Sequence, residues 1–298
     1  MPTAPKREPR SRIVKVANRE IATVGLSNGL WTDLYHRSMT ASWPGFFATA
    51  ALIFLAVNSL FALLFLIGDR PIANTKPGNF LDLLYFSIET FATVGYGDMH
   101  PQTHYAHLVA TIEIFTGMSL LAVMTGLIFA RFSRPRARFL FANQMTVSQH
   151  DGKPTLMIRM ANARHNTISG ATARLWLVRN EPTPEGQDFR RFRELELQRR
   201  ENPFFILSWT LFHTIDETSP LWGMTPEDLE RSDTAFTVNV TGLDETSSQQ
   251  LNARQGYLHT DIRWRHRYVD ILAPSPDGRV TLDYRKFHEV EPDGMTQK

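Results

Sequence analysis

Two long apolar segments enclose a short loop, and this arrangement constrains the fold more than any other feature of the chain. The stretch from Trp43 to Ile67 contains no charged residue, and the stretch from His107 to Phe129 contains one, Glu113. Each is long enough to cross a hydrocarbon core, which takes about 20 residues. The first begins too far from the N-terminus, and is too long, for a cleaved signal peptide. We therefore expect two helices that span a membrane.

The loop between these segments contains the run Thr93-Val94-Gly95-Tyr96-Gly97. In a TVGYG loop, backbone carbonyl oxygens and the threonine hydroxyl replace the hydration shell of a potassium ion. Its glycines provide backbone conformations that residues with a Cβ avoid. The motif predicts a selectivity filter with K⁺ ions at Thr93, Val94, Gly95 and Tyr96, and no organic cofactor. One loop supplies a quarter of such a filter, so we expect a homotetramer.

Basic residues lie mainly before the first apolar segment and after the second. Those before it are Lys6, Arg7, Arg10, Arg12, Lys15, Arg19 and Arg37. Those after it are Arg131, Arg134, Arg136 and Arg138. The positive-inside rule then predicts a multi-pass protein of the cell (inner) membrane with both termini in the cytoplasm. The absence of cysteine excludes disulfides and thiolate metal sites, and fits a cytosolic soluble domain without proving it.

The sequence divides into three parts. Residues 1–40 are expected to form a cytoplasmic N-terminal tail and an interfacial slide helix, in which Trp31, Leu34, Tyr35 and Met39 recur at helical spacing. Packing of this helix on the soluble domain is the alternative. The tail is expected to be disordered or extended, with a strand from Ile13 to Val16 as the alternative. Residues 41–136 are expected to form the pore domain, and residues 137–298 a cytoplasmic regulatory domain.

A short pore helix is predicted ahead of the filter, with Asn79 as its N-cap and Ala92 near its end. If its C-terminal end points toward the membrane centre, the helix dipole favours a cation there. Glu89 precedes the filter by four residues and Asp98 follows it directly. We interpret these two carboxyl groups as filter supports that share one proton behind the filter. The alternative is that Glu89 bonds filter amides alone and Asp98 faces the outer water.

The second apolar segment carries a stripe of residues on one helical face: Met118, Leu121, Thr125 and Phe129. An apolar stripe usually packs on a neighbouring helix. Because the segment leaving a filter must line the cavity beneath it, we interpret the stripe as pore lining with Phe129 as an apolar gate. Gly117 and Gly126 are candidate hinges, although close helix packing explains glycine equally well.

Two further groups on or after this segment have predicted roles. Glu113 lies on the far side of the helix from the stripe, and we expect it to be hydrogen-bonded in a structural role because an intramembrane carboxylate is costly. The arginines that leave the membrane together, Arg131, Arg134 and Arg136, are predicted to bind anionic phospholipids. Simple topological anchoring by these arginines is the alternative.

After about Ala137 the sequence changes to short alternating runs separated by turn signals, a pattern typical of a β-sandwich. The expected strands are Thr155–Met160, Ala173–Val178, Phe204–Leu211, Phe236–Val240 and Ile262–Ile271, with turns at Asp151-Gly152 and Asp277-Gly278 and a short capped helix at Thr225–Leu229. No GxGxxG phosphate-binding loop is present, which argues against a nucleotide-binding domain. His213, Asp216 and Ser219 lack a nucleophile elbow, so we do not expect an enzyme.

The chain from about Trp31 to Phe287 resembles the prokaryotic inward-rectifier potassium channel family. The resemblance rests on the interfacial helix with Ser42-Trp43-Pro44, on the filter, on the run Phe129–Arg136, on Gly242-Leu243-Asp244-Glu245-Thr246 and on Ala253-Arg254. It implies a tetramer with two spans per subunit and an immunoglobulin-like cytoplasmic β-sandwich that extends the pore. It also implies regulation by anionic phospholipids and pH, a bundle-crossing gate at Phe129 and a hinge at Gly117 or Gly126.

Two positions depart from that family pattern. Leu121 stands where strongly rectifying members carry an acid, which puts tight block by internal Mg²⁺ or polyamines in doubt and predicts weak rectification. Thr40 stands where some relatives have a basic residue, which weakens that part of the lipid site.

The favoured function is a K⁺ channel gated by its cytoplasmic domain and anionic lipid, with no nucleic-acid partner. A membrane-tethered β-sandwich binding module with a non-conducting pore is the alternative.

Overall fold

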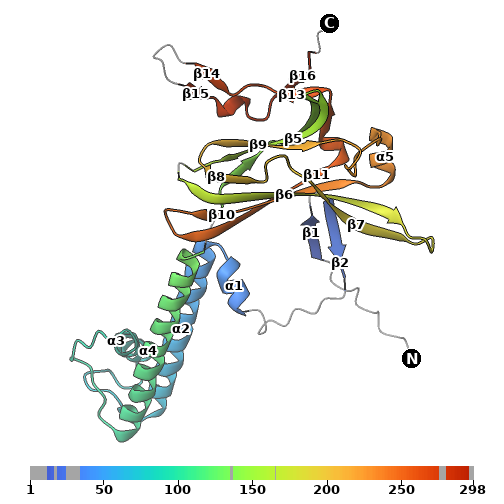
Figure 1. The fold of residues 1–298 in the computed structure, drawn as a ribbon. Helices are drawn as coiled ribbons and strands as arrows, with labels where there is room; N and C mark the ends of the chain where they lie inside the picture. The colour runs from blue at the N-terminus through green and yellow to red at the C-terminus, as the bar shows by residue number, and fades with distance from the viewer. Residues whose placement is uncertain are drawn as a thin grey trace, which may run out of the picture. The chain divides into compact units, whose positions relative to one another are not determined.

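The computed structural model describes residues 12–16, 19–24, 34–134, 137–164, 166–274 and 280–294. These residues form two compact units, Ser27–Arg134 and a second made of Met1–Leu26 with Pro135–Lys298. The first unit is helical and the second consists mainly of strands (Figure 1). Trp31, Arg136 and the predicted turn Asp277-Gly278 lie outside the described residues.

The helical unit contains α1 (Leu34–Thr40), α2 (Trp43–Ile67), α3 (Phe80–Phe91) and α4 (His104–Phe132). The first residues of α2, α3 and α4 are fixed by capping side chains that lie next to them in the sequence. Ser42 accepts a hydrogen bond from Gly45 N at 3.3 Å, and Asn79 Oδ1 accepts one from Leu81 N at 3.1 Å. Thr103 Oγ1 accepts one from Ala106 N at 3.1 Å, which starts α4 one turn before the predicted segment.

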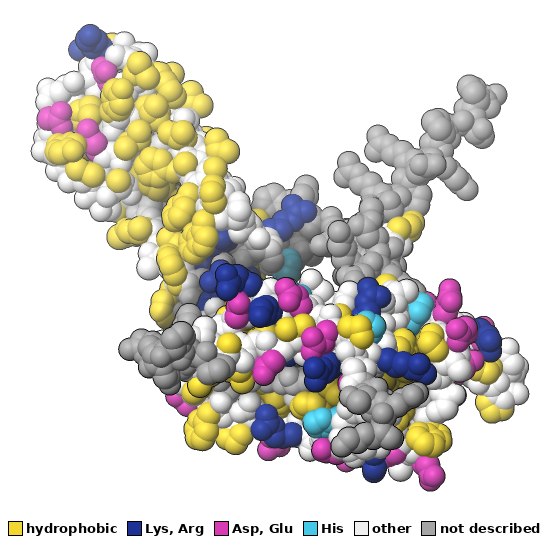
Figure 2. Space-filling view, turned by 90° about the horizontal axis from the view of Figure 1, so that it is seen from above, with side chains coloured by type: hydrophobic (Ala, Val, Ile, Leu, Met, Phe, Trp, Pro, Cys, Tyr) yellow, Lys and Arg dark blue, Asp and Glu magenta, His cyan; other side chains and the backbone are white. Residues whose placement is uncertain are grey.

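The helices α2 and α4 are both long and apolar enough to cross a membrane. Their outward surfaces remain apolar, as a lipid-facing surface requires. Large exposed side chains on α2 include Leu52, Leu60 and Ile67, and those on α4 include Phe115 and Val123. In the space-filling view, hydrophobic side chains cover most of the helical unit, and charged side chains gather on the strand-rich unit (Figure 2).

The second unit is a sandwich of two five-stranded sheets that face each other (Figure 1). One sheet has the order β11-β10-β6-β7, with β8 also paired to β6. Its strands are β6 (Ile168–Pro182), β7 (Asp188–Leu195), β8 (Glu201–Phe205), β10 (Ala235–Asp244) and β11 (Gln249–Leu258). The other sheet has the order β12-β4-β5-β3, with β9 also paired to β5. Its strands are β3 (Phe139–Phe141), β4 (Met145–His150), β5 (Lys153–Asn162), β9 (Ser208–Thr214) and β12 (Ile262–Trp264).

Smaller elements complete this unit. Three two-stranded pairs join β1 (Arg12–Val16) to β2 (Arg19–Thr23), β13 (His266–Tyr268) to β16 (Val290–Pro292), and β14 (Leu272–Pro274) to β15 (Val280–Leu282). The strand weighed as an alternative for Ile13 to Val16 is therefore present, as one arm of a hairpin. The helix α5 (Pro226–Arg231) and two short 3₁₀ turns, His259–Asp261 and Tyr284–Lys286, lie between strands.

Alternation along the strands produces the sandwich core. On β10, Phe236, Val238 and Val240 are buried, and they face a core to which β5 contributes Ile158 and Met160. The predicted hairpin turn is confirmed, because Asp151 and Gly152 have φ values of 51° and 74° between β4 and β5. The short capped helix predicted at Thr225–Leu229 is also confirmed, as α5 with a capping box at Thr225.

Two predicted strands are wrong in length. Phe204–Leu211 is divided between β8 and β9, because residues 206–207 leave the ladder between Phe205 and Ser208. Ile262–Ile271 is divided between β12 and β13 by Arg265, which has a φ of 56° and cannot continue an extended strand.

Candidate functional site

The loop after α3 has a backbone in which the sign of φ alternates. Thr93, Gly95 and Gly97 have φ values of 56°, 61° and 88°, whereas Val94 and Tyr96 lie outside the positive region. Positive φ at the glycines is the kind of backbone conformation that a TVGYG loop needs to coordinate K⁺ with its carbonyl oxygens. Residues 92–98 are all exposed. The loop can therefore present a row of carbonyl oxygens, the ligand set that replaces water around K⁺.

The start of this loop is held by the last turn of α3. Thr93 N donates to Thr90 O at 3.1 Å, and Val94 N donates to Glu89 O at 2.8 Å. These bonds continue the helix into the first loop residues, so the direction of α3 sets the direction of the loop. The C-terminal end of a helix carries partial negative charge, which favours a cation close to it.

The end of the loop is held by the outer segment that follows α2. Asn74, which has a φ of 61°, donates a hydrogen bond from Nδ2 to the carbonyl oxygen of Asp98 at 2.6 Å. Ala73 N donates to His100 O and Gln102 N donates to Pro71 O, each at 2.8 Å. The two segments thus pair as short extended chains on either side of the Ile72–Pro101 bridge.

The Glu89 and Asp98 carboxyl groups are close enough for an electrostatic interaction. Glu89 is partly buried and Asp98 is exposed. Among the described residues no hydrogen bond joins the two carboxyl groups. The shared proton therefore stays a prediction.

The stripe on α4 does not pack on α2. Met118, Leu121, Thr125 and Phe129 are all exposed, and Phe129 is 72% exposed. Thr125 Oγ1 donates to Leu121 O at 2.9 Å, which leaves the hydroxyl lone pairs on the stripe. The packing alternative is thus not supported within the helical unit, and pore lining stays a prediction.

The two glycines on α4 have different surroundings. A Cβ on Gly117 would lie 2.5 Å from the carbonyl oxygen of Phe91, the last residue of α3. Close packing therefore explains Gly117. A Cβ on Gly126 would have no atom within 4 Å, so packing within the helical unit does not explain Gly126 and its hinge role stays a prediction. The helix α4 is continuous through both positions.

Two arginines near the C-terminal end of α4 donate hydrogen bonds to backbone carbonyl oxygens where α1 ends and α2 begins. Arg131, which is 6% exposed, donates from Nη1 to Ser38 O and from Nη2 to Ala41 O, the latter at 2.8 Å. Its guanidinium carbon lies 4.5 Å from the ring centre of Trp43 and 4.6 Å from that of Phe46. The guanidinium of Arg131 is therefore engaged by the chain itself, and its predicted binding of phospholipid stays a prediction.

Arg134 is held less completely. Its Nη1 donates to Met39 O at 2.8 Å. Within the described part of the chain this bond leaves other donors of the guanidinium available, since the group carries five N–H bonds.

Two family models match the chain. One, described as the inward rectifier potassium channel C-terminal domain, matches residues 139–297, and the other, described as ion channel, matches residues 47–134. The chain belongs to the inward rectifier potassium channel family. The resemblance predicted from the sequence is thereby confirmed, and the chain combines two candidate transmembrane helices with a β-rich domain as a family member should.

Relatives within the family include bacterial and animal channels. The inward rectifier potassium channel Kirbac3.1 of Paramagnetospirillum magnetotacticum is 43% identical over 96% of this chain and 97% of its own length. The ATP-sensitive inward rectifier potassium channel 12 of Mus musculus is 28% identical over 96% of this chain and 73% of its own. The human inward rectifier potassium channel 4 is 30% identical over 75% of this chain and 53% of its own. These relatives are channels, and this family member is not an enzyme.

The His213 cluster has the geometry of a structural hydrogen-bond network. His213 Nδ1 lies 2.7 Å from Glu196 O, and its Nε2 lies 2.8 Å from Ser219 Oγ. Asp216 Oδ1 instead accepts from the Thr218 amide and hydroxyl, so it does not orient the imidazole as the acid of a triad would. Burial lowers the pKa of His213, which keeps the ring neutral.

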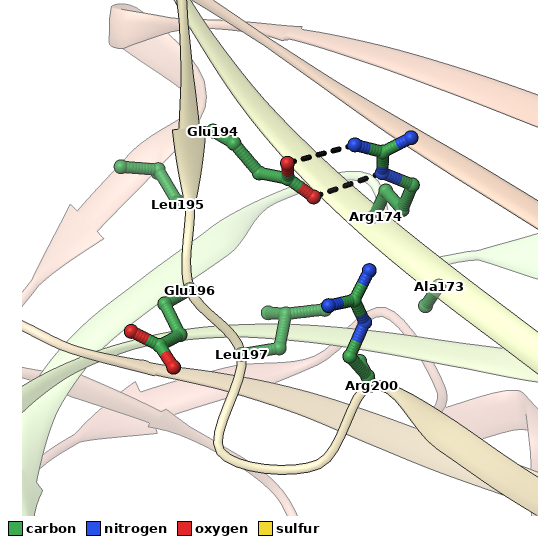
Figure 3. Close-up of a pocket in the computed structure, with 7 residues that line it drawn as sticks. All are labelled: Ala173, Arg174, Glu194, Leu195, Glu196, Leu197 and Arg200. Carbon is green, nitrogen blue, oxygen red and sulfur yellow. Dashed lines mark hydrogen bonds and ion pairs between the residues drawn. The ribbon is translucent and has the colours of Figure 1, made fainter.

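A shallow pocket of about 280 Å³ lies beside this cluster, between β6 and the segment after β7 (Figure 3). Arg174 donates to Glu194 from Nε and Nη2, both at 2.8 Å, and stacks on the Trp176 ring at 4.8 Å. Arg174 lowers the pKa of Glu194. The pair joins β6 to the edge strand β7, which is a sufficient structural role for both residues.

Sequence reasoning missed two features of the site. Asn74 was not singled out, because its contact with Asp98 joins residues far apart in the sequence. Ser87 was also missed, although it contacts the buried Asn58 and Glu113. Polar residues in otherwise apolar spans were the available signal for the second cluster. Glu113 is hydrogen-bonded, as predicted.

Proposed function

We propose that this chain is the subunit of a potassium-selective inward-rectifier-type channel whose filter is the segment Thr93–Gly97. The alternating sign of φ at Thr93, Gly95 and Gly97 carries the proposal. K⁺ ions would bind the carbonyl oxygens of Thr93, Val94, Gly95 and Tyr96 and the Thr93 hydroxyl.

The conducting form is a homotetramer in the inner membrane with both termini in the cytoplasm. One exposed loop coordinates a dehydrated ion on one side only, so four copies around an axis complete the shell. The exposed α4 stripe then faces the axis, with Phe129 as the narrow apolar gate and Gly126 as the bend that opens it. The uneven distribution of basic residues supports the orientation.

Anionic phospholipid is the proposed regulator, acting near the gate. Among the described residues, Arg134 makes one hydrogen bond with its five N–H donors, and Arg136 follows it by two positions in the sequence. Both follow closely on Phe129, so charge binding there would bias the lower end of α4. Leu121 carries no charge, and weak block by Mg²⁺ or polyamines is the expected result.

The test is ion flux through the purified full-length chain in liposomes. Wild type should pass K⁺ in preference to Na⁺, with block by Ba²⁺. Gly95→Ala should abolish K⁺ flux, because alanine disfavours the φ of 61° at a filter ligand. Gly78→Ala is the matched control, since Gly78 has a φ of 73° in the outer segment with equally open surroundings.

Wild-type tetramers that pass no K⁺ in neutral or phosphatidylglycerol-containing vesicles would contradict the proposal. Equal flux through Gly95→Ala and wild type would remove the filter assignment. A folded protein without flux would favour the alternative of a membrane-tethered binding module. Lipid regulation is tested in the same assay by Arg134→Gln, which should weaken the dependence of flux on phosphatidylglycerol.

A further inference from the structure

A polar contact joins all three membrane helices of the helical unit at one point. Ser87 on α3 donates to Asn58 O and Asn58 Oδ1 on α2, each at 3.1 Å. Ser87 Oγ is also hydrogen-bonded to Glu113 Oε1 on α4. Asn58, Ser87 and Glu113 are each 0% exposed. The cluster is therefore a closed set of groups whose protons can be counted.

The hydrogen-bond count favours a proton on Glu113, because the buried Glu113 Oε2 has no partner among the described residues. A serine hydroxyl has one hydrogen to donate, and here it meets three acceptor oxygens. Asn58 Nδ2 is already used, because it donates to Phe54 O at 2.8 Å, and this bond fixes which end of the Asn58 amide faces Ser87. An ionised Glu113 would add only acceptors. A neutral Glu113 donates to Ser87 Oγ and frees the hydroxyl hydrogen for Asn58.

Among the residues that the structure describes, no ion pair or cationic hydrogen-bond donor reaches Glu113. The helix α2 has no charged residue, and the charged residues of α3 are Asp82 and Glu89, both acidic. Asp82 accepts from Lys76 N in the outer loop, and Glu89, two positions after Ser87, points to another face of α3. On α4 itself, His104 and His107 are exposed and Arg131 lies far along the helix. A buried carboxyl without a cation is stable only in its neutral form.

A second contact among the same helices lies one turn further along each of them. Phe54 precedes Asn58 by four residues, Phe91 follows Ser87 by four, and Gly117 follows Glu113 by four. The Phe54 and Phe91 rings meet edge to face at 5.6 Å, and Gly117 lies directly against the Phe91 carbonyl. Each helix thus contributes residues i and i+4 to a junction with one polar and one apolar layer.

We infer that Glu113, as a neutral carboxylic acid donating to Ser87, is the positioning residue that fixes α3 and the filter. Phe91 precedes Thr93 by two residues, so the apolar layer ends where the filter begins. A displacement of Ser87 tilts α3 about the Gly117 contact and moves the filter carbonyl oxygens. This inference rests on the proposed function, because it assigns a role in selective conduction.

The first test compares Glu113→Gln with Glu113→Ala in full-length tetramers, by rubidium uptake into liposomes with sodium as competitor. Glutamine donates to Ser87 as the neutral acid does, so uptake and selectivity should stay within about twofold of wild type. Alanine removes the donor to Ser87 Oγ and leaves a cavity beside it, so uptake should fall about tenfold, with weaker discrimination against sodium. Equal losses in the two variants would overturn the inference.

The second test reads the proton directly and does not need flux. Infrared spectra of wild type near neutral pH should contain the carbonyl band of a buried protonated carboxyl, and Glu113→Gln should lack it. Absence of the band in wild type would overturn the inference. A wild-type channel that shows the band but conducts no K⁺ would contradict the proposed function and the positioning role, while leaving the neutral acid established. Ser87→Ala should shift the frequency of this band; an unshifted band would exclude the hydrogen bond.

Discussion

The guanidinium of Arg131 lies 4.5 Å from the centre of the Trp43 ring while its two terminal nitrogens bond Ser38 and Ala41 carbonyl oxygens. A planar fork is needed for this double role, because lysine offers a point charge without stacking. Arg131→Lys should therefore lower tetramer stability by about 2 kcal/mol per subunit, since hydrogen bonds from a charged donor are lost.

The measurement is the midpoint temperature of tetramer dissociation in neutral and in anionic lipid. Because the partners of Arg131 belong to the chain, the loss should be equal in both lipids. A loss confined to anionic lipid would show that Arg131 acts through headgroups instead.

Asn74→Gly isolates the hydrogen bond to Asp98, because glycine keeps the φ of 61° without strain. Loss of this bond should loosen the outer end of the filter by about 1 kcal/mol. Bound K⁺ stabilises the folded filter, so the K⁺ concentration needed for half-maximal thermal protection should rise. Asn74→Ala, which adds backbone strain, should raise this K⁺ concentration further. Protection curves identical to wild type would remove the role of Asn74.

Gly117→Ala and Gly126→Ala should have opposite effects on stability. At Gly117 the new methyl group would meet the Phe91 carbonyl at 2.5 Å, and the backbone would have to move. At Gly126 the methyl group finds open space, and alanine favours the helix over glycine by about 0.5–1 kcal/mol. The midpoint temperature of tetramer dissociation should fall for Gly117→Ala and rise for Gly126→Ala. If α4 bends at Gly126, K⁺ flux should also be reduced in Gly126→Ala. A stable, selective Gly117→Ala channel would contradict the packing argument.

Glu181 on β6 provides a pH test outside the membrane. Hydrogen bonds from Arg193 and Arg179 lower the pKa of Glu181 to about 2 from an ordinary value of 4.5. Because the pKa of Glu181 is lower in the folded chain, its ionised carboxylate stabilises the fold above pH 4.5. This contribution is lost as the pH falls toward 2. Because the arginines are partly exposed, the contribution is about 1 kcal/mol or less.

Hydrogen exchange of the β6 and β7 amides, compared between wild type and Glu181→Gln at each pH, measures this difference. Protection should be lower in the variant at neutral pH. The difference in protection between the two proteins should shrink as the pH falls from 4.5 toward 2. If the difference in protection between wild type and Glu181→Gln grew as the pH fell, the ionised Glu181 carboxylate would not be the stabilising form.

The parts of the site that depend on neighbouring residues in the sequence were predictable. The two candidate spans, the cap at Asn79 and the turn at Asp151-Gly152 are each coded within a few residues, as is the filter motif, whose role stays a prediction. The strand pattern failed at Arg265, because alternation of apolar residues continues through a position whose backbone turns.

The remaining contacts required the fold. Ser87 meets residues 29 positions before it and 26 after it, and Arg131 meets carbonyl groups 93 and 90 positions earlier. Such contacts depend on how helices cross, which periodicity does not encode. The predicted lipid role of Arg131 followed from its charge alone; its burial against Trp43 was visible only in three dimensions.

The bridge between Ile72 and Pro101 has a consequence for chimaeric channels. The outer segment and the segment leaving the filter are interlocked through their backbones, so neither is an autonomous module. Transplanting a foreign outer surface, for example to create a toxin receptor, would have to exchange both segments together. A graft of either one alone would place mismatched halves at the channel's outer entrance.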